Sequence, residues 1–222
     1  MVKRLWLLLA ATLLFIALCQ PFLQARPTLY QTEKRAALAL AEQAQALLGL
    51  RISGPEYSWI TTTLAPPEAK RLSRHPDFAA VAVGWLKQAG AGPGSRVAVN
   101  LSGSFPALNI AVLAAIEAVG AQPVITSSVG ASTWGATDPE FTWLDMEREL
   151  TAAGLWRSRT VAASLGGVGD AGGGLTPEGK ELARSAIRRS GAELIAAADL
   201  RGAIGRRLQL YRGEANELPP LL

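Results

Sequence analysis

Two loops rich in hydroxyl groups and glycine hold the residues of this sequence best suited to chemistry. The first is Ser102-Gly103-Ser104, and the second runs from Ser127 to Pro139. Hydroxyls and free backbone N–H groups at a helix start suit a carboxylate or phosphate, and glycine permits a tight turn. Trp134 either covers a ligand or packs over the first loop. We expect a ligand site made of Ser102, Gly103, Ser104, Ser127, Ser128, Ser132, Trp134 and Asp138.

Ser104 and Ser128 are the candidate nucleophiles of an alternative, enzymatic interpretation. A serine nucleophile needs a base, and His75 is the single histidine of the chain. His75 precedes Pro76 at the predicted start of a helix, on the solvent side, with no adjacent partner. Ser104 could instead simply cap the helix that follows it. Catalytic residues therefore stay unassigned.

Other ligand chemistries find little support. Asp145 and Glu147 are two residues apart on a predicted helix, so they point to different faces, and we expect them in solvent. One histidine and the single cysteine, Cys19, predict neither a metal site nor a disulfide. Gly167 to Gly172 matches GxGxxG, but further glycines separate it from the next helix. A binding loop is favoured over a dinucleotide site, and we expect no cofactor.

Strands and helices alternate through the part of the chain that carries these loops. The spacing is that of βαβ units with right-handed crossovers, in which both loops leave the same sheet edge. We predict a three-layer αβα sandwich with a mostly parallel sheet. Its strands are expected at 96–101, 122–126, 159–164 and 193–198, and its helices at 106–119, from Asp138-Pro139, from Thr176-Pro177 and at 200–212.

The region before this sheet is predicted mainly helical. A helix is expected at 32–50 with Leu38, Ala41, Ala46 and Leu48 inward, and residues 57–64 form an edge strand or a loop. The helix after His75-Pro76 is expected to bury Phe78, Val81, Trp85 and Ala89, which recur every three or four residues.

The N-terminus has the pattern of a membrane segment. Lys3 and Arg4 precede fifteen uncharged, mostly apolar residues from Leu5 to Cys19. Basic flanks stay in the cytoplasm, so the remainder is predicted to be exported. We favour an uncleaved single-pass anchor in a bacterial inner membrane over a cleaved signal peptide. The predicted organisation is an anchor at 1–25, a helical linker at 26–55 and an α/β domain at 56–222.

Charge argues against nucleic acid as a partner. The chain has a formal charge of +4, and without Lys3 and Arg4 it holds 20 basic against 18 acidic residues. No basic stripe with interleaved aromatic residues is present in the sequence. An anionic partner is therefore not required by the net charge.

Residues 102–147 and 160–187 resemble the poly-gamma-glutamate system protein family. The segments are SGSFPALNIAVLAAIEAVGAQPVITSSVGASTWGATDPEFTWLDME and TVAASLGGVGDAGGGLTPEGKELARSAI. The resemblance implies an accessory role in making or exporting poly-γ-glutamate, with the polymer or its synthase and export components as partners. The alternative is a serine-dependent hydrolase or amide-bond transferase acting on that polymer. The family pattern extends into another Gly-rich βα segment, whereas this chain stops at NELPPLL. If the domain is truncated there, any site built from later strands is missing.

Overall fold

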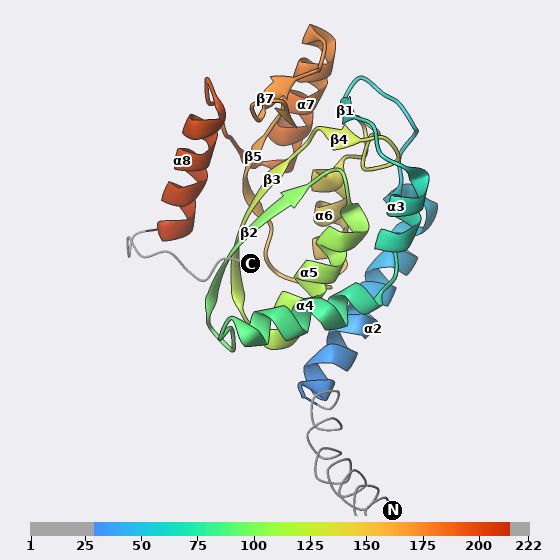
Figure 1. Cartoon of the computed structure of the whole chain (residues 1–222), viewed down its shortest axis with the longest axis vertical. Helices are drawn as coiled ribbons and strands as arrows, with labels where there is room; N and C mark the ends of the chain where they lie inside the picture. The colour runs from blue at the N-terminus through green and yellow to red at the C-terminus, as the bar shows by residue number, and fades with distance from the viewer. Residues whose placement is uncertain (1–28, 214–222) are drawn as a thin grey trace, which may run out of the picture. The chain divides into compact units, whose positions relative to one another are not determined.

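The computed structural model describes residues 29–213 (Figure 1). Its main sheet has four parallel strands in the order β2-β3-β5-β8, which is also their order in the chain. Two small parallel pairs, β1-β4 and β6-β7, lie outside it. The predicted α/β class and mostly parallel sheet are confirmed. The strands are β1 Thr61–Thr63, β2 Arg96–Ser102, β3 Gln122–Ser128, β4 Ala131–Ser132, β5 Thr160–Ser164, β6 Gly166–Gly167, β7 Ala171–Gly173 and β8 Glu193–Leu194.

Seven α-helices and a 3-10 helix make up the rest of the regular structure in residues 29–213. They are α2 Gln31–Leu48, the 3-10 helix Gly49–Ile52, α3 Pro67–Ser73, α4 Asp77–Gln88, α5 Pro106–Val119, α6 Trp143–Ala152, α7 Pro177–Ser190 and α8 Leu200–Arg212. In Figure 1, α8 lies on one side of the sheet, away from α4, α5 and α6.

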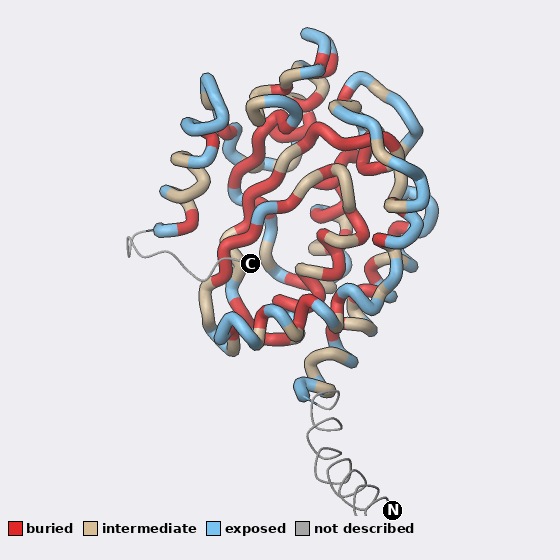
Figure 2. The backbone as a smooth tube through the Cα atoms, in the orientation of Figure 1, coloured by how far each residue is buried: buried red, intermediate tan, exposed pale blue. Residues whose placement is uncertain are grey.

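The two faces of the sheet have different cores. Val99 of β2 and Ile125 of β3 belong to the large buried cluster that α2 and α4 to α7 also form. A much smaller cluster around Ala162 of β5 contains Ala203 of α8. Figure 2 shows the buried residues concentrated along the strands and the inner sides of the helices. Successive right-handed crossovers in one direction place their helices on one face, which explains this asymmetry.

Sequence patterns located several elements closely. The bounds of α5 and α8 agree with the predictions. Helix α7 begins after Thr176, whose hydroxyl accepts the Gly179 N–H, and ends at Gly191 in the left-handed conformation. Residues 57–64 contain the short edge strand β1. Of the residues expected inward on α2, Ala41 and Leu48 are buried, whereas Leu38 is half-buried and Ala46 is exposed.

The predicted buried face of α4 was wrong. Phe78, Val81 and Trp85 are 38%, 43% and 57% exposed, and Ala89, which follows the last residue of α4, is exposed as well. The buried residues are instead Ala79, Ala82, Val83 and Leu86. This helix is apolar on most of its circumference, so periodicity cannot choose a face. The face with alanines packs inward because small side chains let helices approach closely.

Two element boundaries were also wrong. Asp138-Pro139 does not start a helix, because α6 begins after Thr142, where Thr142 and Asp145 form a capping box. Asp138 caps a turn instead by accepting the Glu140 N–H at 2.9 Å. The last strand, β8, has two residues rather than the six expected.

The carboxylates of α6 are not in solvent, contrary to expectation. Asp145 is 2% exposed and accepts hydrogen bonds from the side chains of Arg189 and Thr142. Glu147 is 3% exposed and accepts hydrogen bonds from both the backbone N–H and the hydroxyl of Thr160. They point to different partners, as their spacing predicts. Burial of these carboxylates is tolerated because both oxygens of each one accept hydrogen bonds.

The predicted membrane segment, residues 1–25, lies outside the described residues. Among residues 29–213, no helix combines the length and the apolar character needed to cross a membrane.

Candidate functional site

The two Ser/Gly loops converge. The Gly103 N–H donates to the Ser128 carbonyl at 3.0 Å, and the Ala136 N–H donates to the Gly103 carbonyl at 2.7 Å. Glycine is required where the backbones touch, since a Cβ on Gly135 would lie 2.7 Å from the Gly103 carbonyl oxygen. The loops that follow β2 and β3 thus form one continuous surface.

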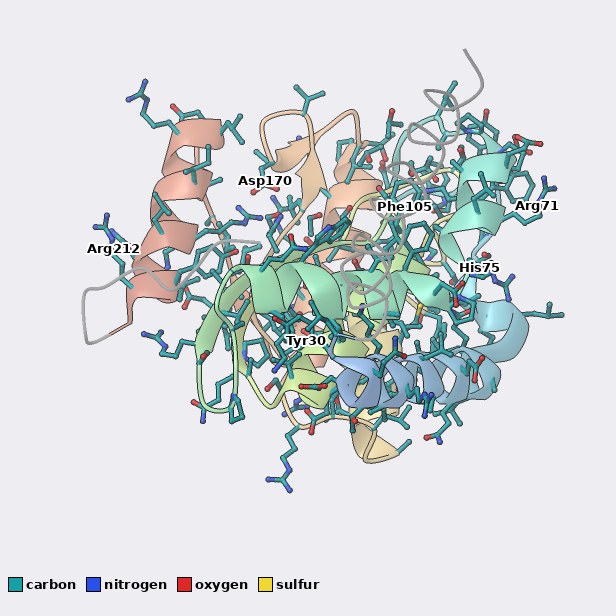
Figure 3. All side chains as sticks on the ribbon, turned by 60° about the horizontal axis from the view of Figure 1, so that its bottom comes forward. Tyr30, Arg71, His75, Phe105, Asp170 and Arg212 are labelled. Atoms are coloured by element: carbon teal, nitrogen blue, oxygen red, sulfur yellow. The ribbon has the colours of Figure 1, made fainter. Side chains whose placement is uncertain are left out.

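Lys70 of α3 joins the two loops. Its ammonium group donates to the Ser104 carbonyl and, at 2.5 Å, to the Ser132 hydroxyl. The same nitrogen lies 3.9 Å from the centre of the Phe105 ring. Figure 3 labels Phe105 near the helix that carries Arg71, the neighbour of Lys70 in the chain. Lys70 is 5% exposed, so these contacts hold it in the interior.

The charge of Lys70 has no acidic partner among the described residues. Its hydrogen-bond acceptors are neutral oxygens, and burial lowers its pKa from 10.5 to about 8. At neutral pH the ammonium form therefore still predominates. A buried charge without a counter-ion is costly, and a bound anion would reduce that cost.

A small cavity adjoins Lys70. It has a volume of about 10 Å³, roughly the space of one water molecule, and no carboxylate lines it. Arg74, Ser73 and Trp134 contribute to its wall, together with the first residues of α5. Trp134 has a φ of 63°, which is uncommon for a bulky residue, and it lines this cavity. Positive groups, hydroxyls and a helix start therefore surround one cavity.

Backbone donors of both loops are used within the protein. The Ser104 N–H donates to the Ser102 hydroxyl at 3.2 Å, and the Ser132 N–H donates to the Ser104 hydroxyl at 3.0 Å. Ser104 does not cap α5, whose N-cap is Phe105 without a side-chain bond. An anion at this site would therefore meet the Lys70 side chain rather than a ring of free N–H groups.

The other expected site residues lie elsewhere. Ser102 and Ser128 align with Ser164 across the ends of β2, β3 and β5. Ser127 is fully buried and bonded to the Thr160 hydroxyl at 2.7 Å. The structure thus groups Ser104, Ser132 and Trp134 around Lys70, and it separates them from Ser127 and from the turn at Asp138.

A second polar cluster lies beside Ser164, between the sheet and α8. Ser164 donates to Asp170 at 2.6 Å, and Arg207 of α8 binds both of these residues and Asn100. Figure 3 labels Asp170 on the side of α8, away from Phe105. Every member of this cluster is paired, so it fixes α8 on the sheet rather than offering an open site.

Lys70 was missed by sequence reasoning. It lies in the charged stretch EAKRLSR, where nothing distinguishes it from Arg71 or Arg74. His75 is exposed at the solvent-side helix start that was expected, but contrary to expectation it has an adjacent partner, because its Nδ1 lies 3.4 Å from the Asp77 carboxylate. Within residues 29–213, no cluster of three or more His, Cys, Asp or Glu side chains could hold a metal ion.

Comparison with known proteins found no matching family model, no matching curated protein and no matching solved structure.

Proposed function

We propose that this chain is an accessory protein of poly-γ-glutamate synthesis or export. In this proposal residues 1–25 anchor it in a bacterial inner membrane, and its three-layer αβα domain lies on the exported side. The domain binds a carboxylate of the γ-glutamyl polymer at the Lys70 site, defined as Lys70, Arg74, Ser104, Ser132 and Trp134. The resemblance of residues 102–147 and 160–187 to the poly-gamma-glutamate system protein family supports the choice of this polymer. The chemistry of the Lys70 site supports the binding of an anion.

One observation carries the proposal: Lys70 is buried and has only neutral acceptors. A carboxylate would pair with this charge through a charge-assisted hydrogen bond, and the adjoining cavity, which holds about one water molecule, would have to widen to admit it. Poly-γ-glutamate carries one free carboxylate on each unit, next to apolar methylene groups that suit the half-buried ring of Trp134. A synthase or export partner could present an acidic side chain to the same site.

Binding of defined γ-glutamyl oligomers to the full-length protein in detergent tests the proposal. Lys70→Met should weaken the Kd by at least about tenfold, which is about 1.4 kcal/mol. Lys34→Met is the matched control, since it removes the same charge from a partly exposed position on α2. Circular dichroism should show that both variants keep their helices.

The outcomes separate specific from non-specific binding. Equal losses in the two lysine variants would mean general attraction of a polyanion, and no binding by the wild type would reject the proposal. Affinity should also fall as the pH rises through 8 in the wild type, because Lys70 then loses its proton. The Lys70→Met protein should lack that pH dependence.

A second candidate function is a serine-dependent hydrolase or transferase acting on the same polymer. The 2.5 Å contact between Lys70 and the Ser132 hydroxyl favours it, because the neutral amine that a pKa of about 8 makes accessible would take the hydroxyl proton, as lysine does in some serine enzymes. The nucleophile would then be Ser132, since the Ser104 hydroxyl accepts the Ser132 N–H rather than bonding to Lys70. An unchanged polymer length after incubation, with no labelling of Ser132 by a fluorophosphonate probe, would remove this candidate.

A further inference from the structure

A groove beside strand β2 has the size of a small-molecule site. Its volume is about 330 Å³, within the range of roughly 300–1,000 Å³ that such sites occupy. Residues of β2 form one wall, and residues of α4 and α5 form the others. Trp85 of α4 is 57% exposed, and Leu108 and Val112 of α5 are half-buried, so these apolar walls are reachable from solvent.

The walls of the groove carry no charge. No Asp, Glu, Lys, Arg or His side chain lines it. Transfer of an ion into apolar surroundings without a counter-ion is costly, so a carboxylate of the kind that the Lys70 site is proposed to bind does not suit this groove. The ligand that fits these walls is an uncharged, mainly apolar molecule.

A buried amide on the groove wall lacks one of its hydrogen-bond partners. Asn109 of α5 lines the groove and is 6% exposed. Its Nδ2 donates to the Ser102 carbonyl at 2.8 Å, whereas its Oδ1 accepts no hydrogen bond from the described residues. Within residues 29–213, the fully buried side-chain atoms without a partner are nitrogens of Gln45, Trp143 and Trp156, so the Asn109 oxygen is accessible. It offers a hydrogen-bond acceptor inside the groove.

The backbone of β2 adds polar groups on the same side. The Gly103 N–H donates to the Ser128 carbonyl, and the Gln122 N–H donates to the Ser95 carbonyl, so the odd-numbered residues direct their backbone groups at β3. Those of Ala98 therefore point away from β3, and Ala98 lines the groove at 4% exposure. No described residue pairs with them on that side, although buried backbone groups are almost always paired. Helix α4 covers this edge, so a small molecule is a better partner than a further strand.

We propose that this groove binds an uncharged, mainly apolar small molecule that carries a hydroxyl or amide N–H group. Its apolar body lies against Trp85, Leu108 and Val112, and its donor group bonds to the Asn109 Oδ1. A few polar groups in an apolar cleft fix the orientation of a ligand, which makes binding specific. The groove shares no residue with the Lys70 site, so either site can fail its test without the other.

Three matched probes test the groove in the full-length protein in detergent. 2-Naphthol has an apolar body and a hydroxyl donor, 2-methoxynaphthalene lacks the donor, and 2-naphthoate carries a negative charge instead. Fluorotryptophan labelling gives a fluorine NMR signal for Trp85, which the Trp85→Phe protein identifies. That signal should shift on titration with 2-naphthol, and 2-naphthoate should not shift it.

Asn109→Leu tests the hydrogen bond. The preference for 2-naphthol over 2-methoxynaphthalene should be about fivefold larger in the wild type than in this variant, which corresponds to one net hydrogen bond. Partition of the probes into micelles is the same for both proteins and cancels in this ratio. An equal preference in the two proteins would mean that the groove accepts any apolar body, and it would overturn the proposal.

Val112→Phe tests the location of the probe. The larger side chain narrows the groove, so 2-naphthol should bind at least about tenfold more weakly. Val168→Phe is the matched control, since Val168 is 79% exposed and lies outside the groove. Circular dichroism should show that the variants keep their helices. Unchanged binding to Val112→Phe, a Trp85 signal that no probe shifts, or a shift as large with 2-naphthoate would overturn the proposal.

Discussion

Lys70 donates a hydrogen bond to the Ser132 hydroxyl at 2.5 Å, and neither residue is more than 5% exposed. This contact joins α3 to the end of β4, and the same ammonium group reaches the Ser104 carbonyl after β2. A single cation therefore connects three segments that are far apart in the chain. Burial of this charge lowers the stability of the folded protein, and the loss should be measurable as a pH dependence of the free energy of unfolding.

Stability should rise with pH in the alkaline range because of Lys70. Burial lowers its pKa to about 8, whereas the unfolded chain binds that proton up to about 10.5. Between pH 8 and pH 10.5 the unfolded state therefore binds more protons than the folded state, so the free energy of unfolding rises as the pH rises. Relative to Lys70→Met, the wild type should gain on the order of 2 kcal/mol in urea unfolding between pH 7.5 and 10.5. Parallel curves for the two proteins would show that Lys70 is not desolvated.

Gly135→Ala should separate the two loops. An added Cβ would lie 2.7 Å from the Gly103 carbonyl oxygen and 2.9 Å from that of Ser104, and both are backbone atoms that cannot easily move. We expect a loss on the order of 2 kcal/mol in unfolding free energy and weaker binding of γ-glutamyl oligomers. Gly84→Ala is the control, for which we expect the unfolding free energy to rise rather than fall. Gly84 lies inside α4 with no atom within 4 Å of its Cβ position, so alanine should stabilise by roughly 0.5–1 kcal/mol. Equal effects of the two changes would contradict the close approach.

Arg189→Ala should destabilise the domain more than Arg188→Ala, the same change at the neighbouring residue. Desolvation by burial raises the pKa of Asp145, but hydrogen bonds from Arg189 and Thr142 outweigh it and hold that pKa below its ordinary value. Removing Arg189 leaves a carboxylate that is 2% exposed without its main partner. The expected loss is on the order of 2–3 kcal/mol by urea unfolding. Arg188→Ala breaks an exposed pair with Glu181 and should cost about 0.5 kcal/mol or less.

The sheet could be predicted from the sequence, and the Lys70 site could not. Strand β2 and helix α5 carry local patterns, namely a short apolar run, a proline at the helix start and a glycine at its end. The environment of Lys70 comes instead from Phe105 and Ser132, which no local pattern links to α3. The start of α6 was misplaced because Asp138-Pro139 and Thr142 with Asp145 are both credible caps, and only tertiary packing decides between them.

Glu147 should make stability fall with pH in the neutral range. Desolvation by burial raises its pKa from 4.5 to about 7, although two hydrogen bonds from Thr160 oppose the shift. Between pH 4.5 and pH 7 the folded state therefore binds more protons than the unfolded state, so the free energy of unfolding decreases as the pH rises. Above pH 7 the free energy of unfolding stays at this lower level. Glu147→Gln removes the charge, and the Thr160 hydroxyl can turn to accept from the new amide while donating to Ser127. Relative to the wild type, this variant should therefore be more stable at pH 8 by on the order of 2 kcal/mol, and the advantage should largely vanish at pH 5. Glu117→Gln, at an exposed position of α5, should show no such pH-dependent gain. An advantage that is the same at both pH values would mean that Glu147 ionises normally in the folded protein.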